Sequence, residues 1–441
     1  MNRRQFTKLA LMGAFGGLAS AGCREEDVGG PVEVTYWEKW TDFEGEAMRA
    51  VVEAFNEERD DIQVKLLTIS QIDQKTLMAT AGGIPPDVAG LWSQNLVSYA
   101  DKNALLPLDD YLSAAGLGRE DFIPCYWDML EHRGHIWGLP TTPASVALHW
   151  NKRLFDEAGL PADEPPQTME QLWEYTQLLT KRDEHGKIVQ MGFMPAEPGW
   201  WNWAWGYFFG GRLWDGEGTI TCDSAENVRA FEWVQSYAKQ YGTKELQVFR
   251  SGFGNFSSAQ NAFLDGRVAM ELQGVWMHNF IDMYAKHLDW GAAPFPHPAD
   301  RPDLANTTIV EEDVVAIPNG AKHPDEAFEF MQFVNSQRGM ELLCMGQRKH
   351  TPLREVSQEF LDQHPNPYIS VFIELARSAN ALTTPKLSIW NEYANEMSAA
   401  FDEVWLDRKS GEEALRYVQN RMQPKLERVL RRWERLGWRS A

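Results

Sequence analysis

The stretch QKTLMATAGGIPPDVAGLW, from Gln74 to Trp92, does most to decide the fold of this chain. Its first half favours a helix that stops at Gly82-Gly83, because paired glycines break a helical pattern. Its second half, Asp87–Trp92, is short and apolar, as is typical of a buried strand. The stretch therefore predicts one helix-to-strand step of an α/β fold.

Upstream of this stretch the same alternation occurs again. Strand patterns are found at Val32–Trp40 and Ile62–Ile69, and the amphipathic segment Glu44–Asp60 lies between them. Strands that alternate with helices at this spacing predict βαβ units and a parallel sheet. No glycine-rich phosphate loop opens any of these helices, so the pattern gives no support for nucleotide binding.

The middle of the chain is predicted to contain one strand followed mostly by helices. A proline-marked segment leads into an apolar strand, Ser145–Trp150, and Asp156–Gln260 then reads as mostly helical. One helix is expected to start near Thr168, with Gln171 at capping-box spacing, and another at Ser224.

The last third of the chain again alternates strand and helix patterns before it becomes helical. Gly266–Phe280 predicts a strand, a turn at Gly274 and a helix. Val314–Val334 predicts a strand followed by a helix that begins near His323-Pro324. Beyond Thr351-Pro352 the chain is expected to be helical to its end.

Composition limits the function classes. A chain of 441 residues, 44% hydrophobic and 24% charged, is globular and long enough for two domains. Its formal net charge of −21 argues against nucleic acid and against anionic lipid as partners. The 19 tryptophans are the unusual feature.

The first residues read as an export signal. Arg3-Arg4, followed by a short apolar stretch, resembles a twin-arginine signal, and Ser20–Cys23 resembles a bacterial lipobox whose Cys23 becomes acylated. Ala19–Ala21 also fits a plain cleavage site, so lipid anchoring and free secretion both stay open. We expect an export signal at residues 1–22 and a polar tether at 23–31, with no later membrane span.

Cysteine and histidine give no sign of metal or redox chemistry. Cys125, Cys222 and Cys344 are far apart and form no C-x-x-C pair, so buried free thiols are expected. His132 and His135 have no ligand spacing and read as structural or exposed. We therefore expect neither a metal nor a cofactor.

Four tryptophans fall within WWNWAWGYFFGG, Trp200–Gly211. Such a cluster suits a core, a membrane-touching surface or a platform for a flat apolar ligand. Trp205, Phe208 and Phe209 recur at helical spacing and are expected in the core, whereas Trp203 fits either role.

Five segments, in this order and behind an export signal, resemble the extracellular solute-binding proteins of bacterial ABC sugar importers, the maltose-binding-protein-like family. They are GGIPPDVAGLW (Gly82–Trp92), LHWNKRLFDEAGL (Leu148–Leu160), FFGGRLWD (Phe208–Asp215), FLDGRVAMELQGVW (Phe263–Trp276) and VVAIPNGAKHPDEAFEFMQFV (Val314–Val334). The resemblance covers nearly the whole chain after the export signal.

The resemblance implies an α/β, two-lobed periplasmic-binding-protein fold of type II, with hinge-linked lobes and a ligand cleft between them. Carried over, lobe one holds residues 32–140 plus 310–349, and lobe two holds 144–306 plus 353–441. The crossings then fall near Thr141–Pro143, Thr307–Ile309 and Thr351-Pro352, each marked by proline or threonine.

The resemblance also implies a set of ligand-binding residues. Asn95 stands where the family pattern has a hydroxyl-binding carboxylate, which leaves the identity of the sugar open. For each tryptophan the alternative is packing, and for the acids and Arg348 it is a surface or lobe-to-lobe ion pair. The full set is Trp40, Thr41, Trp92, Asn95, Glu197, Trp200, Trp201, Gly274, Trp276, Glu312, Asp313, Arg348 and Trp390.

The function implied is capture of a carbohydrate outside the cell, expected to be an oligosaccharide, and its delivery to an ABC permease by hinge closure. The chain is expected to be a monomer, not an enzyme, in the periplasm or on the outer face of the cytoplasmic membrane. A binding protein for a non-sugar solute such as a polyamine is the alternative, and a glycoside-active enzyme a more distant one. Sugars suit this chain because aromatic rings cover their apolar faces while amides and carboxylates bind their hydroxyls.

Overall fold

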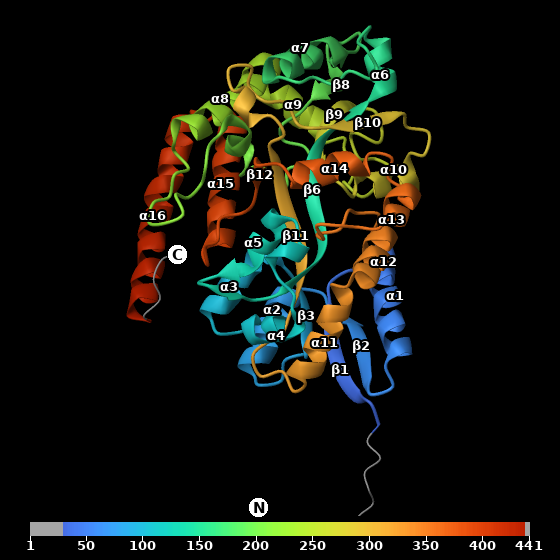
Figure 1. Cartoon of the computed structure of the whole chain (residues 1–441). Coiled ribbons are helices and arrows are strands. Elements are labelled where there is room, and N and C mark those ends of the chain that lie inside the picture. Colours follow the sequence, from blue (N-terminus) through green and yellow to red (C-terminus); the bar gives the residue numbers. More distant parts are fainter. Residues whose placement is uncertain (1–29, 437–441) are drawn as a thin grey trace, which may run out of the picture.

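The computed structural model describes residues 30–436, and in this range ten strands form one continuous sheet (Figure 1). The strand order is β2-β1-β3-β11-β6-β9-β8-β7, with β10 beside β6 and β12 beside β11. The strands are β1 (Val32–Glu38), β2 (Ile62–Thr68), β3 (Val88–Trp92), β6 (Leu139–Asn151), β7 (Lys181–Arg182), β8 (Ile188–Phe193), β9 (Val268–Gly274), β10 (Trp290–Ala293), β11 (Thr308–Ala316) and β12 (Ala381–Leu382); β4 (Glu131–His132) and β5 (His135–Ile136) form a separate hairpin.

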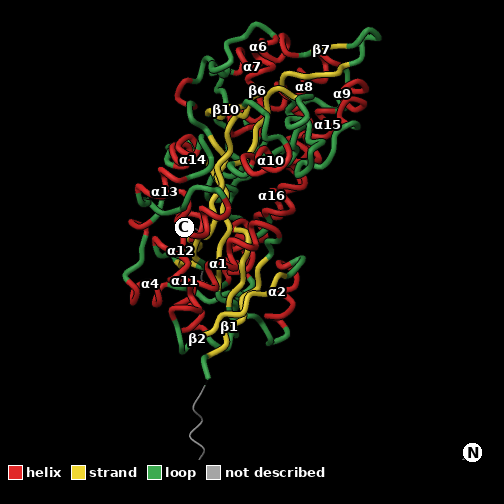
Figure 2. Tube along the Cα trace, turned by 90° about the vertical axis from the view of Figure 1, so that its right-hand side faces the viewer, coloured by secondary structure: helices red, strands yellow, loops and turns green. Residues whose placement is uncertain are grey.

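Helices cover both ends of this sheet (Figures 1 and 2). They are α1 (Asp42–Glu58), α2 (Ile72–Ala81), α3 (Leu96–Asp101), α4 (Asp109–Ala115), α5 (Pro124–Leu130), α6 (Lys152–Glu157), α7 (Met169–Leu179), α8 (Ala225–Tyr241), α9 (Thr243–Arg250), α10 (Met277–Tyr284), α11 (Pro324–Val334), α12 (Gln337–Gln347), α13 (Gln358–Gln363), α14 (Ile369–Ala376), α15 (Trp390–Trp405) and α16 (Gly411–Arg435).

The first βαβ units form as the sequence predicts. β1 is parallel to β2, with Val32 opposite Ile62, and it is also parallel to β3. α2 ends at Ala81 and its last turn is closed by the Gly82 amide, which donates to Met78 and Thr80 carbonyls. The expected parallel sheet of an α/β fold is therefore confirmed for this part of the chain.

Two long strands carry the chain between the halves of the molecule. All 13 residues of β6 are buried; its first half pairs with β11, and its second half pairs with β9 and β10. The prediction of a short strand, Ser145–Trp150, was therefore too narrow. Pro143 does not break β6, because it lies opposite Glu312 at a bulge in the ladder, where a proline is tolerated.

The expectation of a mostly helical Asp156–Gln260 was also incomplete, because β7 and β8 lie inside it. β8 is the buried segment IVQMGF, parallel to β9, and a short apolar run of that kind is compatible with a strand. The helix signals were accurate: Thr168 and Gln171 form a reciprocal capping box at α7, and Ser224 caps α8.

The described chain packs around two main apolar cores, so the fold is two-lobed. One core gathers residues such as Val34, Leu91 and Phe330, and the part of the chain around it is called lobe one below. The other gathers residues such as Leu148 and Phe193, and the part around it is called lobe two. The proposed lobe boundaries stay a prediction; Leu353 and Phe360, which they assign to lobe two, pack in the core of lobe one.

Helix α16 joins the lobes a second time. It packs on α8 and α15 of lobe two and runs down one side of the molecule (Figure 1). Near its end, the buried Trp433 donates its indole N–H to the Asp101 carboxylate of lobe one at 2.9 Å. The Arg133 guanidinium lies 4.5 Å above the same ring. Asp101 also binds His132 at 2.9 Å, so this histidine is structural.

The prediction of buried free thiols is confirmed for two of the three cysteines after the export signal. Cys222 and Cys344 are buried free thiols, and Cys125 is a half-buried one. The export signal, Cys23 and most of the tether lie outside the described residues. No helix within residues 30–436 is long and apolar enough to cross a membrane.

Replacing Trp433 by Phe should weaken the attachment of α16 to lobe one. The Phe ring keeps most of the apolar contact but cannot donate to the Asp101 carboxylate, and losing a hydrogen bond to a charged group costs about 1.5–3 kcal/mol. Urea unfolding of Trp433→Phe and of Trp405→Phe separates the loss of the hydrogen bond from the loss of apolar contact. Trp405 is equally buried, but its indole N–H has no hydrogen bond within residues 30–436. Equal losses in both variants would contradict a role for the bond.

Candidate functional site

A cavity of about 530 Å³ lies between the lobes. Five tryptophans line it, together with polar side chains from both lobes. The lining residues are Gln94, Trp200, Trp201, Trp203, Trp276, Glu311, Trp390, Asn391, Ala394, Asn395 and Ser398. We call it the tryptophan cavity.

Three of its indoles form one cluster in lobe two. The Trp276 ring lies 5.7 Å from Trp200 and 6.0 Å from Trp201, with tilted planes. A Cβ at Gly274 would collide with the Trp276 ring, so the glycine is needed to seat that ring. Gly274 was expected to bring the backbone close to a ligand; its open side is instead filled by Trp276, which is the residue that faces the cavity.

The remaining two indoles meet at the start of α15. Trp203 and Trp390 are edge to face at 4.8 Å, and both are buried except where they border the cavity. The aromatic segment is thus divided between two roles. Trp205, Phe208 and Phe209 form a buried 3₁₀ helix, Trp205–Phe209, in the core of lobe two, as expected. The first three tryptophans of the segment precede that helix in turns and face the cavity, rather than starting a helix.

The acidic residues of β11 alternate between the two faces of the strand. Glu311 lines the tryptophan cavity, and burial together with the nearby Asp313 charge raises its pKa to about 7. Glu312 lies between them on the other face; neither of its carboxyl oxygens has a hydrogen-bond partner in the described part of the chain. Burial and the Asp313 charge hold the Glu312 pKa well above its ordinary value.

Asp313 is held by three groups around the hinge. It accepts from the Trp40 indole at 2.8 Å and from the Thr142 hydroxyl at 3.0 Å, and it pairs with the Lys39 ammonium group at 3.1 Å. Burial alone lowers the pKa of Lys39, but the charges of Asp313 and Glu38 outweigh it and raise that pKa. The Asp313 carboxylate therefore organises the lobe-one side of the cleft.

Trp40 and Trp92 lie beside this ion pair. Their rings are edge to face at 6.4 Å, and the Lys39 ammonium group is 5.1 Å from the Trp40 ring and 5.2 Å from the Trp92 ring. Both indoles are half-buried. The structure thus brings Trp40, Trp92 and Asp313 together on lobe one, next to the β11 segment that carries Glu311.

Asn95 connects the lobes directly. Its side chain donates to Asp73 at 3.0 Å and accepts from the Asn391 amide of lobe two at 2.9 Å. Burial raises the pKa of Asp73, while the Lys39 charge opposes that change. Asn95 is therefore engaged with protein partners, and its neighbour Gln94 is the residue that lines the cavity.

The other residues expected at the site lie apart from the cavity lining. Arg348 pairs with Asp282 of lobe two at 2.6 Å, which is the lobe-to-lobe ion pair weighed as its alternative. Glu197 pairs with Arg250 beside a separate small pocket. Thr41 is exposed at the start of α1 and bonds to Asp42.

Sequence reasoning missed Gln94, Glu311, Asn391, Asn395 and Ser398. A signal existed for Glu311, since strand periodicity places it on the face of Asp313 and not on that of Glu312. Asn391, Asn395 and Ser398 follow Trp390 at helical spacing on α15. The prediction of Trp390 therefore already indicated which face of the helix carries these three residues. Among residues 30–436 no group of three or more His, Cys, Asp or Glu side chains is arranged to hold a metal ion.

Comparison with known proteins places this geometry in a family. The profile of the bacterial extracellular solute-binding proteins matches residues 41–341. The chain belongs to this family. Its members are substrate-binding proteins, and the two-lobed fold with a cavity between the lobes agrees with that membership.

Individual relatives are distant in sequence. A maltotriose-binding protein of Pyrococcus abyssi is 20% identical over 60% of this chain, and this alignment spans only 54% of the relative's own length. A putative binding protein of Brucella abortus is 22% identical over 76% of this chain and 78% of its own. An arabinooligosaccharide-binding protein of Halalkalibacterium halodurans is 23% identical over 58% of this chain and 57% of its own.

Solved structures resemble the chain more completely. The protein CpMnBP1, solved with mannotriose bound, has a TM-score of 0.76 and 27% identity, covering 88% of this chain and 99% of its own. The sugar-binding protein MalE of Xanthomonas citri has a TM-score of 0.74 at 19% identity, covering 91% and 98%. These similarities establish the two-lobed fold over nearly the whole described chain.

The raised pKa of Glu311 predicts a pH-dependent cavity. The folded state holds a proton on this carboxyl up to about pH 7, whereas an ordinary glutamate loses it near 4.5. Its contribution to folding stability is therefore full below that window and falls as pH rises through it. A tryptophan-fluorescence titration should show a transition near pH 7.

Substitution of the two neighbouring glutamates tests this assignment. Glu311→Gln should abolish the transition, because the amide does not titrate. Glu312→Gln is the matched control: its carboxyl does not line the tryptophan cavity, so the transition assigned to Glu311 should persist. A transition that survives Glu311→Gln would assign it to another group.

Proposed function

We propose that this chain captures a neutral oligosaccharide in the tryptophan cavity and delivers it to an ABC permease. The observation that carries the proposal is the pairing, in one cavity between the lobes, of five indoles with amide and hydroxyl groups. Indole faces match the apolar C–H faces of a pyranose, and Gln94, Asn391 and Asn395 can both donate to and accept from its hydroxyls. The volume of about 530 Å³ is within the range of small-molecule sites.

The charge of the lining argues against the alternatives. Within the described chain, Glu311 is the single carboxylic acid that lines the cavity, and its pKa near 7 leaves it only partly ionised at neutral pH. A polyamine would require several carboxylates to pair with its ammonium groups. Glycoside hydrolysis would require two carboxyl groups facing across the sugar bond.

Hinge closure provides the transport step. A ligand that touches Gln94 of lobe one and the indoles of lobe two at once binds a closed arrangement better than an open one, and so shifts the population toward it. The bonds Asn95–Asn391 and Arg348–Asp282 join the lobes in the described structure and would be made or broken by the same motion. The proposal includes four further statements. The chain is exported, Cys23 is acylated, the protein is a monomer, and the residues expected from the sequence to bind the ligand do so.

A titration with defined sugars tests the proposal. The panel takes mannobiose, mannotriose, maltotriose and an arabinooligosaccharide, together with spermidine and glucose, and follows tryptophan fluorescence and melting temperature. Saturable binding of one oligosaccharide is expected, with a stabilisation of about 2.7 kcal/mol at a hundredfold excess over Kd. Recovery of a cleaved sugar would favour the enzyme, and a response to spermidine alone would favour the polyamine.

Replacing Trp276 by Ala should weaken the bound oligosaccharide at least tenfold. The change removes an indole that contacts both Trp200 and Trp201 and borders the cavity, and loss of aromatic stacking costs on the order of 1–3 kcal/mol. Trp173→Ala is the control, because Trp173 is also half-buried but packs on Tyr237 away from the cavity. Calorimetry on both variants should show loss of affinity only in Trp276→Ala. If Trp276→Ala and Trp173→Ala bound the oligosaccharide with equal affinity, the ligand would bind outside the tryptophan cavity.

A further inference from the structure

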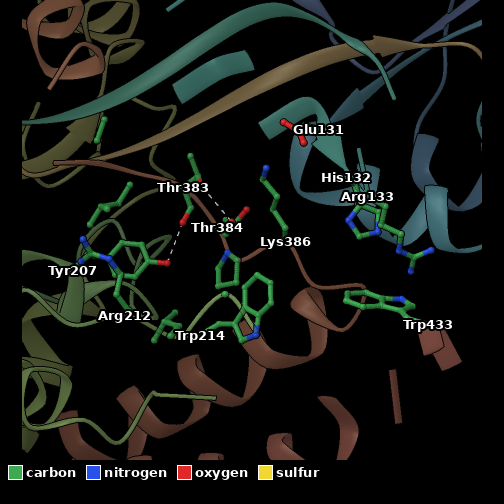
Figure 3. A pocket seen from close by; sticks show the side chains of 15 residues that line it. Glu131, His132, Arg133, Tyr207, Arg212, Trp214, Thr383, Thr384, Lys386 and Trp433 are labelled. Carbon is green, nitrogen blue, oxygen red and sulfur yellow. Dashed lines mark hydrogen bonds between the residues drawn. The ribbon is translucent and has the colours of Figure 1, made fainter. Parts of the chain in front are cut away.

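A second cavity, of about 430 Å³, lies on the other side of Trp203 from the tryptophan cavity (Figure 3). The Trp203 ring separates the two, because it contacts Trp390 of the tryptophan cavity at 4.8 Å and Tyr207 of the second cavity at 5.7 Å. No described residue lines both cavities. The lining of the second cavity comes from the β4–β5 hairpin of lobe one and from 207–216, 381–386 and Trp433 of lobe two.

The two cavities differ in the charged groups of their linings. In the second cavity the acid Glu131 is accompanied by three basic side chains, Arg133, Arg212 and Lys386 (Figure 3). In the tryptophan cavity the acid Glu311 is accompanied by indoles, amides and a hydroxyl group, and no Lys, Arg or His of the described chain lines it. A neutral ligand does not supply the positive charge that this lining lacks.

Glu311 is a carboxyl group without a protein partner. It is half-buried, and among residues 30–436 its side chain forms no hydrogen bond and no ion pair. Burial and the nearby Asp313 charge raise its pKa to about 7, and no described cation offsets their effect. A carboxylate in such a place is stable when a cation pairs with it. A ligand that brings a cation would therefore stabilise the ionised form of Glu311.

The lysines on the lobe-one side of the cleft are already paired with other acids. Lys39 lies 3.1 Å from Asp313 and 3.4 Å from Glu38, and Lys349 lies 2.8 Å from Glu44. In this group the acids outnumber the lysines even before Glu311 is counted. The field at the lobe-one wall of the cleft thus favours a cationic group on the ligand.

We propose that the tryptophan cavity binds an oligosaccharide in which one unit is an amino sugar more tightly than it binds a neutral oligosaccharide, and that Glu311 determines this preference. The inference rests on the proposed function, because it concerns the same cavity. The ligand ammonium group donates to the Glu311 carboxylate, while the sugar rings lie on the indoles. Indole faces also attract cations, which favours an ammonium group inside this cavity.

The pairing predicts that binding of an amino sugar releases a proton from Glu311. At pH 6 the carboxyl of the free protein is mostly protonated, because its pKa is about 7, whereas the ion pair requires the carboxylate. Binding at pH 6 should therefore release close to one proton, and the affinity should rise as pH increases toward 7. A neutral sugar does not require the ionised carboxyl and should release much less.

Calorimetric titration of the full chain with matched sugars tests the preference. Glucosamine, galactosamine and mannosamine are each compared with the parent hexose and the N-acetyl form, and mono-deacetylated chitobiose is compared with diacetylchitobiose. At least one amino sugar should bind about tenfold or more tightly than its neutral counterparts. Its binding heat at pH 6 should differ between phosphate and ACES buffers by the heat of the released proton. The inference is overturned if no amino sugar binds up to about 10 mM, or if binding releases no proton.

Two variants test whether Glu311 is the residue responsible. Glu311→Gln should bind the amino sugar and its neutral counterpart equally, without proton release, and its retained affinity for the neutral sugar shows that it is folded. Glu396→Gln is the matched control. Glu396 follows the cavity residue Asn395 on α15 but does not line the cavity and pairs with Arg421 at 2.7 Å, so this variant should keep the preference. A preference that survives in Glu311→Gln, or that both variants lose equally, would refute the role of Glu311.

The same titrations distinguish failure of this inference from failure of the proposed function. Neutral sugars that bind as tightly as their amino counterparts would overturn the inference and leave capture of a neutral oligosaccharide standing. Amino sugars that bind with proton release, when no neutral oligosaccharide binds, would support the inference and overturn capture of a neutral oligosaccharide.

Discussion

The hydrogen-bonded ladder between β6 and β11 is the constraint on which the rest of the structure depends. Both strands run from one lobe into the other, and nearly every residue in them is buried, so neither can shift without breaking buried backbone hydrogen bonds. The bulge at Glu312 is where the register changes, and Pro143 stands opposite it. The chain thus bends at a defined point, and the cavity between the lobes opens beside that point.

The same ladder decides which acids can meet a ligand. Because side chains alternate along a strand, Glu311 and Asp313 share one face and Glu312 faces the other. Asp313 forms an ion pair with Lys39 and accepts hydrogen bonds from Trp40 and Thr142, so its charge stabilises the hinge. Glu311 has no such cation among residues 30–436, and burial beside Asp313 raises its pKa to about 7. One strand therefore supplies a carboxyl whose pKa is near 7 at Glu311, a buried one with a raised pKa at Glu312, and an ion-paired one at Asp313.

Sequence patterns were sufficient for the elements and for the aromatic side of the site. Period-two and period-3.6 apolar patterns, with the caps at Thr168 and Ser224, located most strands and helices because local physics fixes them. The resemblance to the family supplied Trp200, Trp201, Trp276 and Trp390, all of which border the cavity. The sequence could not predict which polar side chains are hydrogen-bonded or ion-paired to other groups of the protein.

That limit has a physical origin in long-range pairing. Asn95 is occupied by Asp73 and Asn391, and Arg348 by Asp282, and each of these pairs joins residues distant in sequence. Such a contact depends on the relative placement of the lobes, which no local pattern encodes. The second cavity illustrates the same point, since the hairpin of Glu131, the segment of Lys386 and the end of α16 meet only in the folded chain.

The two cavities are mechanically connected through shared walls. Trp203 touches Trp390 on one side and Tyr207 on the other, so a ligand that displaces either ring alters the packing of both cavities. Each cavity also takes residues from both lobes, so the shape of each depends on how the lobes are arranged. The arrangement of the lobes, held by β6, β11 and the Trp433 contact, is therefore the variable through which the whole molecule responds to a ligand.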